Sequence, residues 1–310
     1  MDAGAVARDR GAHGNTPMTD QALDTAAPLP QVASNVARDE AHARLVIAPG
    51  TTARNYWRDL WRYRELLYFL AWRDVVVRYK QTAIGIAWAL IRPALTMLVF
   101  VAFRKLAALP STAVPAPVFV LAAVLPWQFF ASALSESSGS LIGNANLISK
   151  VYFPRLIIPA AAVVTSLVDF AVTLGLLALV MAWYGVAPGW QIVALPAFVA
   201  MTFGLALGLG LLLAALNVEY RDFRYVVPFI VQFGLFVSPV AFATADVPES
   251  WRLLYALNPL VGIIDGFRWS LLGGALDTGT VWIALAVTAA TIAVGVWYFR
   301  KMECSFADVI

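Results

Sequence analysis

The chain has 310 residues, of which 61% are hydrophobic and 13% are charged, with a formal net charge of +3. Soluble globular domains carry about 25% charged residues, so this composition excludes an ordinary soluble protein and predicts an all-α integral membrane protein. The positive charges lie beside apolar runs, which indicates membrane topology rather than nucleic-acid binding.

The first 50 residues hold no apolar segment after a basic start, so they do not resemble a cleavable signal peptide. They mix small, polar and charged residues, which offer too little apolar surface to offset the entropy of ordering. We expect residues 1–53 to be a disordered cytoplasmic tail, with sequence from an expression vector as the alternative. The transmembrane domain is expected over residues 54–310.

Residues 55–80 show the pattern of an amphipathic helix. Aromatic and apolar residues recur at three- and four-residue spacing, whereas most arginines fall elsewhere around the helix. This pattern predicts a helix that lies in the membrane interface. The alternative, a helix packed on a soluble domain, requires a domain that the composition does not supply.

Six apolar runs follow, and we interpret each as a transmembrane span. The spans are expected at about 83–103, 118–134, 157–184, 192–216, 226–242 and 281–299. Gly204 and Gly208 lie one turn apart in the fourth span, a spacing of small residues that allows another helix to approach closely.

Arg92 and Pro93 interrupt the first span. The helix from Arg92 to Arg104 would be only about 18 Å long, too short for a hydrocarbon core of about 30 Å. The span must therefore begin near residue 83, which leaves Arg92 at membrane depth. A charge there faces a bundle interior or a wet cavity, and the alternative is that it extends to the cytoplasmic headgroups.

Residues 244–274 are moderately apolar but are broken by prolines and glycines. Two short helices that meet at Asn258 and Pro259 fit this segment better than one full span. Non-helical backbone is tolerated at membrane depth where protein or water surrounds it. We therefore expect a re-entrant helix pair before the last span.

Lysines and arginines set the orientation. With six spans, four basic groups fall on one face, which the positive-inside rule makes cytoplasmic together with both termini. These groups are Arg73, Arg78 and Lys80; Lys150 and Arg155; Arg221 and Arg224; and Arg300 and Lys301.

Motifs for catalysis and cofactor binding are missing from the sequence. Both histidines, His13 and His42, lie in the expected tail, and no metal-ligand cluster or phosphate-binding loop is found. We therefore expect no enzyme activity, no metal and no cofactor on this chain. It is interpreted as a passage that takes its energy from another protein.

Four long segments carry a resemblance to a known family. They are RDVVVRYKQTAIGIAWALIRPALTMLVF (73–100), NANLISKVYFPRLIIPAAAVVTSLVDF (144–170), NVEYRDFRYVVPFIVQFGLFVSPVAF (217–242) and VPESWRLLYALNPLVGIIDGFRWSLLG (247–273). They resemble, in the same order, the membrane subunit of polysaccharide-exporting type-two ABC transporters. The resemblance covers nearly everything from Arg54 onward, and Phe242 stands where the family pattern has a tyrosine.

The resemblance implies a homodimer of six-span subunits, docked on two copies of a separate ABC ATPase that binds ATP and Mg. The cargo would be a polysaccharide linked to undecaprenyl diphosphate, with O-antigen preferred, exported across the bacterial cytoplasmic (inner) membrane. It also implies that the loop between the second and third spans forms a helix inserted into the ATPase. A small-molecule or drug exporter of the same fold is the alternative, and a membrane glycosyltransferase is a more distant one.

The loop that begins at Asn144 is the expected contact with the ATPase. Tyr152 and Phe153 would be apolar anchors, and Pro154 would end a rigid helix that acts as a lever. An ordinary surface loop is the alternative. The candidate coupling residues are Asn144, Lys150, Tyr152, Phe153 and Arg155.

A passage for a long glycan should be lined by aromatic residues, because sugar C–H faces pack on aromatic rings. Each such residue, taken alone, is also compatible with a lipid-facing or core position. The candidate lining residues are Trp88, Phe100, Trp127, Phe130, Phe233 and Phe236.

A diphosphate carrier would require cations at its entrance, and guanidinium groups suit phosphate geometry. Positive-inside topology and contact with anionic lipids are the alternative explanation. The candidate entrance residues are Arg73, Arg78, Lys80 and Arg92. On the opposite face, the re-entrant pair would provide an outer gate with Asn258, Pro259 and Arg268.

Overall fold

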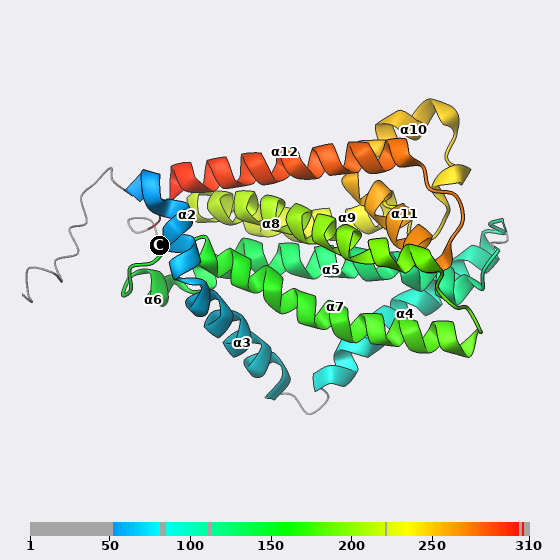
Figure 1. The fold of residues 1–310 in the computed structure, drawn as a ribbon, viewed down its shortest axis with the longest axis horizontal. Helices are drawn as coiled ribbons and strands as arrows, with labels where there is room; N and C mark the ends of the chain where they lie inside the picture. The colour runs from blue at the N-terminus through cyan, green and yellow to red at the C-terminus, as the bar shows by residue number, and fades with distance from the viewer. Residues whose placement is uncertain (1–51, 81–84, 111–112, 221, 304–305, 307–310) are drawn as a thin grey trace, which may run out of the picture. The chain divides into compact units, whose positions relative to one another are not determined.

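The computed structural model describes residues 52–80, 85–110, 113–220, 222–303 and 306 (Figure 1). The chain divides into two units, Met1–Arg54 and Asn55–Ile310. Of the first unit only residues 52–54, the beginning of a helix, are described, so the tail expected over 1–53 lies almost wholly outside the described residues. The second unit carries the fold.

Every regular element in the described residues is a helix, which confirms the all-α prediction. The helices are α2 (Thr52–Arg62), α3 (Arg64–Lys80), α4 (Gly85–Leu106), α5 (Ala116–Gly143), α6 (Ala145–Ile148), α7 (Ile157–Trp183), α8 (Leu195–Glu219), α9 (Phe223–Val237), α10 (Glu249–Ala256), α11 (Pro259–Leu272) and α12 (Thr278–Met302), with 3-10 turns η1 (Trp190–Ala194) and η2 (Thr244–Asp246).

Among the described residues, five helical segments are long and apolar enough to cross a membrane. They are Ala87–Leu106, Ala116–Gly143, Ile157–Trp183, Trp190–Glu219 and Thr278–Met302. The second is longer than expected, because α5 continues through its serine-rich end. The hydroxyls of Ser137, Ser138 and Ser140 each donate to a carbonyl three residues earlier in the same helix, so these serines do not end it.

The expected fifth span, 226–242, is wrong at its carboxyl end. The helix there, α9, has 15 residues, which is about 22 Å of helix and short of a hydrocarbon core of about 30 Å. Ser238 has an extended backbone (φ −91°, ψ 151°), as is favoured before a proline, and Pro239 follows it. Helix is lost there, five residues before the expected end.

The single amphipathic helix expected over 55–80 is two helices, α2 and α3, which separate at Tyr63. The break allows each helix to pack on a different surface. Tyr56 of α2 is buried beside Glu303, to which its hydroxyl donates (3.4 Å), whereas Leu70 and Ala71 of α3 are buried against α7. Exposed positions of the two helices carry aromatic residues as well as charged ones; the aromatic ones are Trp57, Trp61, Tyr68, Phe69 and Trp72.

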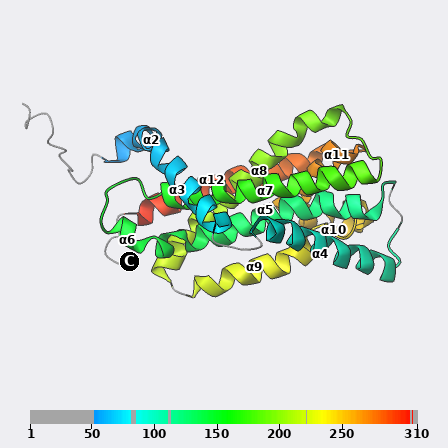
Figure 2. The same ribbon diagram turned by 90° about the horizontal axis from the view of Figure 1, so that it is seen from below.

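Helix α5 lies at the centre of the bundle, in contact with α7, α8, α4, α9 and α11. The apolar window of α5 is 78% buried, compared with 17% for that of α4. Helices α12, α8, α5 and α7 run side by side (Figure 1), and α4 and α9 lie along one side of α5 (Figure 2). A cavity is lined by α4, α9 and the neighbouring side of α5.

The close helix approach expected at Gly204 and Gly208 is confirmed, and the other helix is α12. A Cβ atom added to Gly208 would lie 2.7 Å from the backbone nitrogen of Ile292, and one added to Gly295 would lie 2.0 Å from the Gly208 carbonyl oxygen. The two backbones are therefore in direct contact.

Two short helices do meet at Asn258 and Pro259, as expected. The Asn258 side chain accepts a hydrogen bond from the Leu260 N–H (3.1 Å), and Pro259 occupies the first helical position of α11, which are both favoured at a helix start. Helix α11 is buried against α5, α8 and α12, whereas α10 exposes Trp251 and Leu253. The pair lies at the end of the bundle opposite α6 (Figure 1).

Candidate functional site

A cavity of about 1260 Å³ lies between α3, α4, α5, α7 and α9. Its described walls combine aromatic, neutral polar and charged side chains. The aromatic ones are Tyr79, Trp88, Trp127, Phe129, Phe170 and Phe236; the neutral polar ones include Thr96, Gln128, Ser132, Ser135 and Gln232; and the charged ones are Arg78, Arg92, Glu136 and Asp169. Such a surface can stack on sugar rings and form hydrogen bonds with their hydroxyl groups.

Three of the six aromatic candidates come together at this cavity: Trp88, Trp127 and Phe236. The other three do not occur among the described lining residues. Phe100 and Phe130 are buried in the hydrophobic core, and Phe233 is 53% exposed. Sequence reasoning missed Phe129 and Phe170, whose rings lie 5.2 Å apart between centroids.

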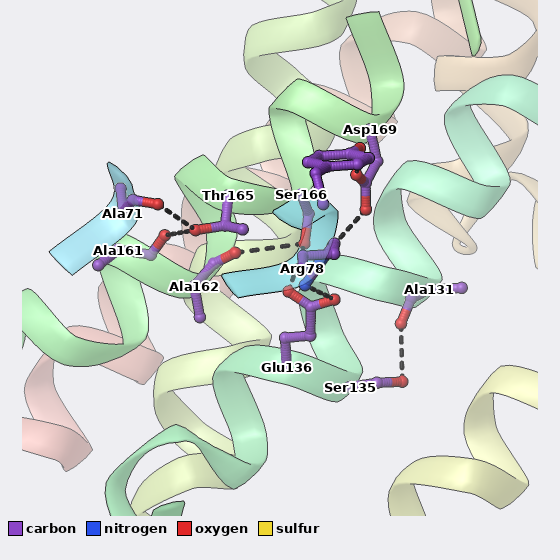
Figure 3. A network of polar contacts seen from close by, with 11 residues as sticks. Ala71, Arg78, Ala131, Ser135, Glu136, Ala161, Ala162, Thr165, Ser166 and Asp169 are labelled. Atoms are coloured by element: carbon purple, nitrogen blue, oxygen red, sulfur yellow. Dashed lines mark hydrogen bonds and ion pairs between the residues drawn. The ribbon is translucent and has the colours of Figure 1, made fainter. Parts of the chain in front are cut away.

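Charged side chains from three helices meet at one end of the cavity. The guanidinium of Arg78 on α3 forms ion pairs with Glu136 of α5 (2.5 Å) and with Asp169 of α7. The Tyr79 hydroxyl donates to Asp169, and the Ser166 hydroxyl donates to Glu136 (3.2 Å). Figure 3 shows Arg78 between the two carboxylates.

The carboxylates keep Arg78 charged. Burial lowers the pKa of Arg78, but hydrogen bonds and charge interactions with Glu136 and Asp169 outweigh it, and the net pKa lies above the ordinary value. Burial, followed by the bond to Asp169, raises the pKa of Tyr79. Tyr79 is therefore a neutral donor at physiological pH.

Glu136 and Asp169 were not among the predicted site residues, although the sequence held a signal for both. Each is an isolated acidic residue inside an otherwise apolar or hydroxyl-rich helix. Ionisable groups at such positions are costly and are usually functional or paired.

The four candidate entrance residues do not form one cluster. Arg78 and Arg92 line the cavity, and Arg92 is exposed there. Arg73 is turned toward Asp74 (2.7 Å) and toward Asn144 (3.1 Å between Nη2 and Oδ1). Lys80 is exposed at the end of α3.

The connection between α5 and α7, residues 144–156, differs from the expected lever. Its only described helix, α6, has 4 residues and ends before Tyr152. Phe153 is buried with 4% exposure, whereas Tyr152 is 55% exposed. The prediction of a rigid helix up to Pro154 with both aromatics as exposed anchors is therefore wrong.

The physical reason is that the chain folds back onto the bundle at this point. Phe153 and Leu156 belong to a cluster that includes Phe299 of α12. The Arg155 N–H donates to the Glu303 carboxylate (2.9 Å), and its guanidinium donates to the Glu303 carbonyl oxygen (2.5 Å). Lys150 and Tyr152 remain exposed on the connection, together with Asn146, Ser149 and Val151.

The candidate gate residue Arg268 is buried and holds backbone in place. Its guanidinium donates to the carbonyl oxygens of Val240 (3.0 Å) and Phe242 (3.1 Å). Arg104 donates to the carbonyl oxygens of Ala241 (2.5 Å) and Pro110 (2.8 Å). Sequence reasoning considered Arg104 only for topology, so its contact with this non-helical segment was missed.

Comparison with known proteins identifies the family of the chain. The family model described as "ABC-2 type transporter" matches residues 65–272. The chain is 30% identical over 237 residues to the O-antigen export system permease protein RfbA of Myxococcus xanthus. The aligned residues make up 76% of this chain and 91% of the relative. A protein of the same name from Klebsiella pneumoniae is 27% identical over 248 residues, covering 79% of this chain and 95% of the relative.

A more distant relative is the polysialic acid transport protein KpsM of Escherichia coli. It is 24% identical over 237 residues, which cover 74% of this chain and 91% of the relative. The expected resemblance to polysaccharide-export permeases is confirmed by these relatives.

Proposed function

This chain belongs to the ABC-2 type transporter family, and we propose that it is the membrane-spanning subunit of an ATP-driven exporter of O-antigen or a similar polysaccharide. The observation that carries the proposal is the similarity to O-antigen export permeases over three quarters of the chain. The ATP and Mg would be bound by a separate ABC ATPase, two copies of which serve the complex, and this chain itself would bind no cofactor.

The cavity supports a glycan better than a small molecule. Its volume of about 1260 Å³ exceeds the roughly 300–1,000 Å³ of most small-ligand sites. Aromatic rings lie beside amides and hydroxyls, as a surface for successive sugar rings requires. We propose that Trp88, Trp127 and Phe236 contact the moving chain.

We propose a homodimer in which two copies meet along α4 and α9. These helices lie beside the cavity, and their outward faces carry large exposed apolar side chains, including Leu95, Val99 and Phe229. A second copy placed there would cover these faces and would close the open side of the cavity into a passage.

The proposed topology is that of a bacterial inner-membrane protein with cytoplasmic termini. Five long helices would span the membrane, and the shorter α9 would be the remaining span of six. Helices α2 and α3 would lie in the cytoplasmic interface, and α10 and α11 would form the re-entrant pair that carries Asn258, Pro259 and Arg268 on the outer side.

The connection 144–156 would face the ATPase, with Lys150 and Tyr152 as its exposed contacts. An undecaprenyl diphosphate carrier would approach from the same side. Arg73, Lys80 and Arg92 are the proposed cations for its diphosphate, because guanidinium and ammonium groups bind phosphate oxygens.

The test is transport by the permease purified together with its ATPase and reconstituted in lipid vesicles. ATP-dependent movement of an undecaprenyl-diphosphate-linked O-antigen, measured by its access to an external glycosidase, is the expected result. Movement of hydrophobic dyes without glycan movement would instead identify a small-molecule exporter. Glycan elongation in the absence of ATP would identify a glycosyltransferase.

A further inference from the structure

The ion pairs of Arg78 connect three helices at one end of the cavity (Figure 3). We propose that Glu136 and Asp169 form a latch with Arg78, which holds α3 across this end of the cavity and controls access to it. The inference rests on the proposed role of the cavity as the glycan passage. It assigns a gating function to Glu136 and Asp169, whose presence the positive-inside rule does not explain, because that rule concerns lysine and arginine.

The latch responds to the spacing of α5 and α7. Glu136 lies on α5 and Asp169 on α7, and one guanidinium reaches both. An ion pair weakens within a few ångströms of separation. A relative shift of the two helices therefore removes at least one of the two pairs.

The same two helices are joined by the connection 144–156, which places the latch close to the proposed ATPase contact. Glu136 precedes the end of α5 at Gly143 by seven residues, or about 10 Å of helix. Helix α7 begins directly after the connection. A movement of the connection is thus transmitted to both carboxylates through rigid helices.

Helix α3 is also fastened at the connection itself. The Arg73 guanidinium donates to the Asn144 side chain (3.1 Å), and the Thr165 hydroxyl of α7 donates to the Ala71 carbonyl oxygen (3.4 Å). The segment from Ala71 to Arg78 therefore contacts α7 at both ends, the connection through Arg73 and α5 through Arg78. Movement of the connection is expected to release α3 at two points together.

The exposure of the latch makes it reversible. The side chains of Arg78, Glu136 and Asp169 are 32%, 31% and 25% exposed, so water can replace each partner at small cost. A fully buried ion pair would be much harder to open. The Ser166 hydroxyl also donates to Glu136, so Arg78 is not the sole donor to that carboxylate.

Access to the cavity is measured with a cysteine at Ser132, a residue of its wall. Cys304, the single cysteine of the sequence, is first replaced by serine. The permease and its ATPase are reconstituted, and the rate of labelling by a membrane-impermeant maleimide is followed without nucleotide. The variants Glu136→Gln and Asp169→Asn should each label faster by about fivefold, the effect expected of losing one partly exposed ion pair.

Two further variants separate gating from a purely structural role. Glu249→Gln removes the carboxylate of an exposed ion pair with Arg252 on α10 (3.8 Å) and should leave the rate unchanged. Arg78→Glu combined with Glu136→Arg is made in the Asp169→Asn background, where opposite charges are restored between α3 and α5 and no carboxylate on α7 faces the new glutamate. Its labelling should lie within about twofold of the Asp169→Asn rate, since the attraction between α3 and α5 is re-formed.

The outcomes are distinguishable from failure of the proposed function. Parent-like labelling in Glu136→Gln and Asp169→Asn, with unchanged thermal unfolding, would overturn the latch, as would labelling of a folded charge-exchange variant several-fold faster than that of Asp169→Asn. If either neutral variant fails to fold, Arg78→Lys replaces it. This variant should also label faster, because a single ammonium group does not reproduce the forked contact of a guanidinium with two carboxylates.

Labelling requires no glycan. A chain with the expected labelling and no glycan transport would therefore retain the latch and lose the proposed function.

Discussion

The guanidinium carbon of Arg268 lies 3.7 Å from the ring centroid of Phe119, and that of Arg104 lies 4.9 Å from the same centroid. The two arginines donate to the carbonyl oxygens of three consecutive residues, 240–242. Irregular backbone inside an apolar bundle is stable only when protein groups satisfy its polar atoms. The pair therefore explains how the non-helical residues 238–243, between α9 and η2, are stabilised.

Replacing Arg268 with methionine should destabilise the fold. The substitution retains apolar volume but leaves the carbonyl groups of buried Val240 and half-buried Phe242 without these donors, which should cost about 2–4 kcal/mol of unfolding free energy. Unfolding of the detergent-solubilised protein by denaturant measures the loss. Arg252→Met is the matched control, because Arg252 also donates to two carbonyl groups but is exposed. Equal losses in the two variants would contradict this account.

Replacing Gly295 with leucine should separate α12 from α8. A Cβ atom at this position would lie 2.0 Å from the Gly208 carbonyl oxygen, and backbone cannot yield as a flexible side chain does. The expected loss of unfolding free energy is about 1–3 kcal/mol or more, measured as above. Gly175→Leu on α7, where no heavy atom lies within 4 Å of the added carbon, should remain close to the parent.

Tyr152 and Phe153 should respond differently to substitution by alanine. Tyr152→Ala removes an exposed ring and should leave stability unchanged while it weakens binding of the ATPase by about tenfold, as is common for an interface tyrosine. Phe153→Ala empties a buried position and should cost about 3–5 kcal/mol of unfolding free energy. Pull-down of the ATPase and denaturant unfolding measure the two effects. Normal ATPase binding by Tyr152→Ala would exclude this contact.

Phe236 and Phe233 of α9 provide a test of the cavity wall. Phe236 lines the cavity and is 68% exposed, whereas Phe233 is 53% exposed and packs on Phe229, with 4.3 Å between ring centroids. Phe236→Ala should slow ATP-dependent glycan transport by about fivefold, the effect of one lost aromatic contact. Phe233→Ala should retain the parent rate, and the reverse order of effects would assign the passage to a different face of α9.

Much of the fold is determined by the sequence itself. The length of an apolar run, a proline or a capping asparagine acts within a few residues, so the bounds of α7 and the start of α11 were predicted to within a residue, whereas α12 extends three residues beyond its predicted span at each end. The spacing of Gly204 and Gly208 likewise predicted a close helix approach. These signals are local, and each depends on the covalent chemistry of its own segment.

Only the tertiary structure decided which side chains meet. Arg78 reaches Asp169 across 91 positions of the chain, and no periodicity within either segment indicates that contact. In the same way, neighbouring aromatics that look equivalent in the sequence take opposite roles, since Phe153 is buried and Tyr152 is exposed. Local sequence patterns indicate whether a residue can be buried or can bind a polar group. The packing of helices that are distant in the sequence determines which residue it contacts.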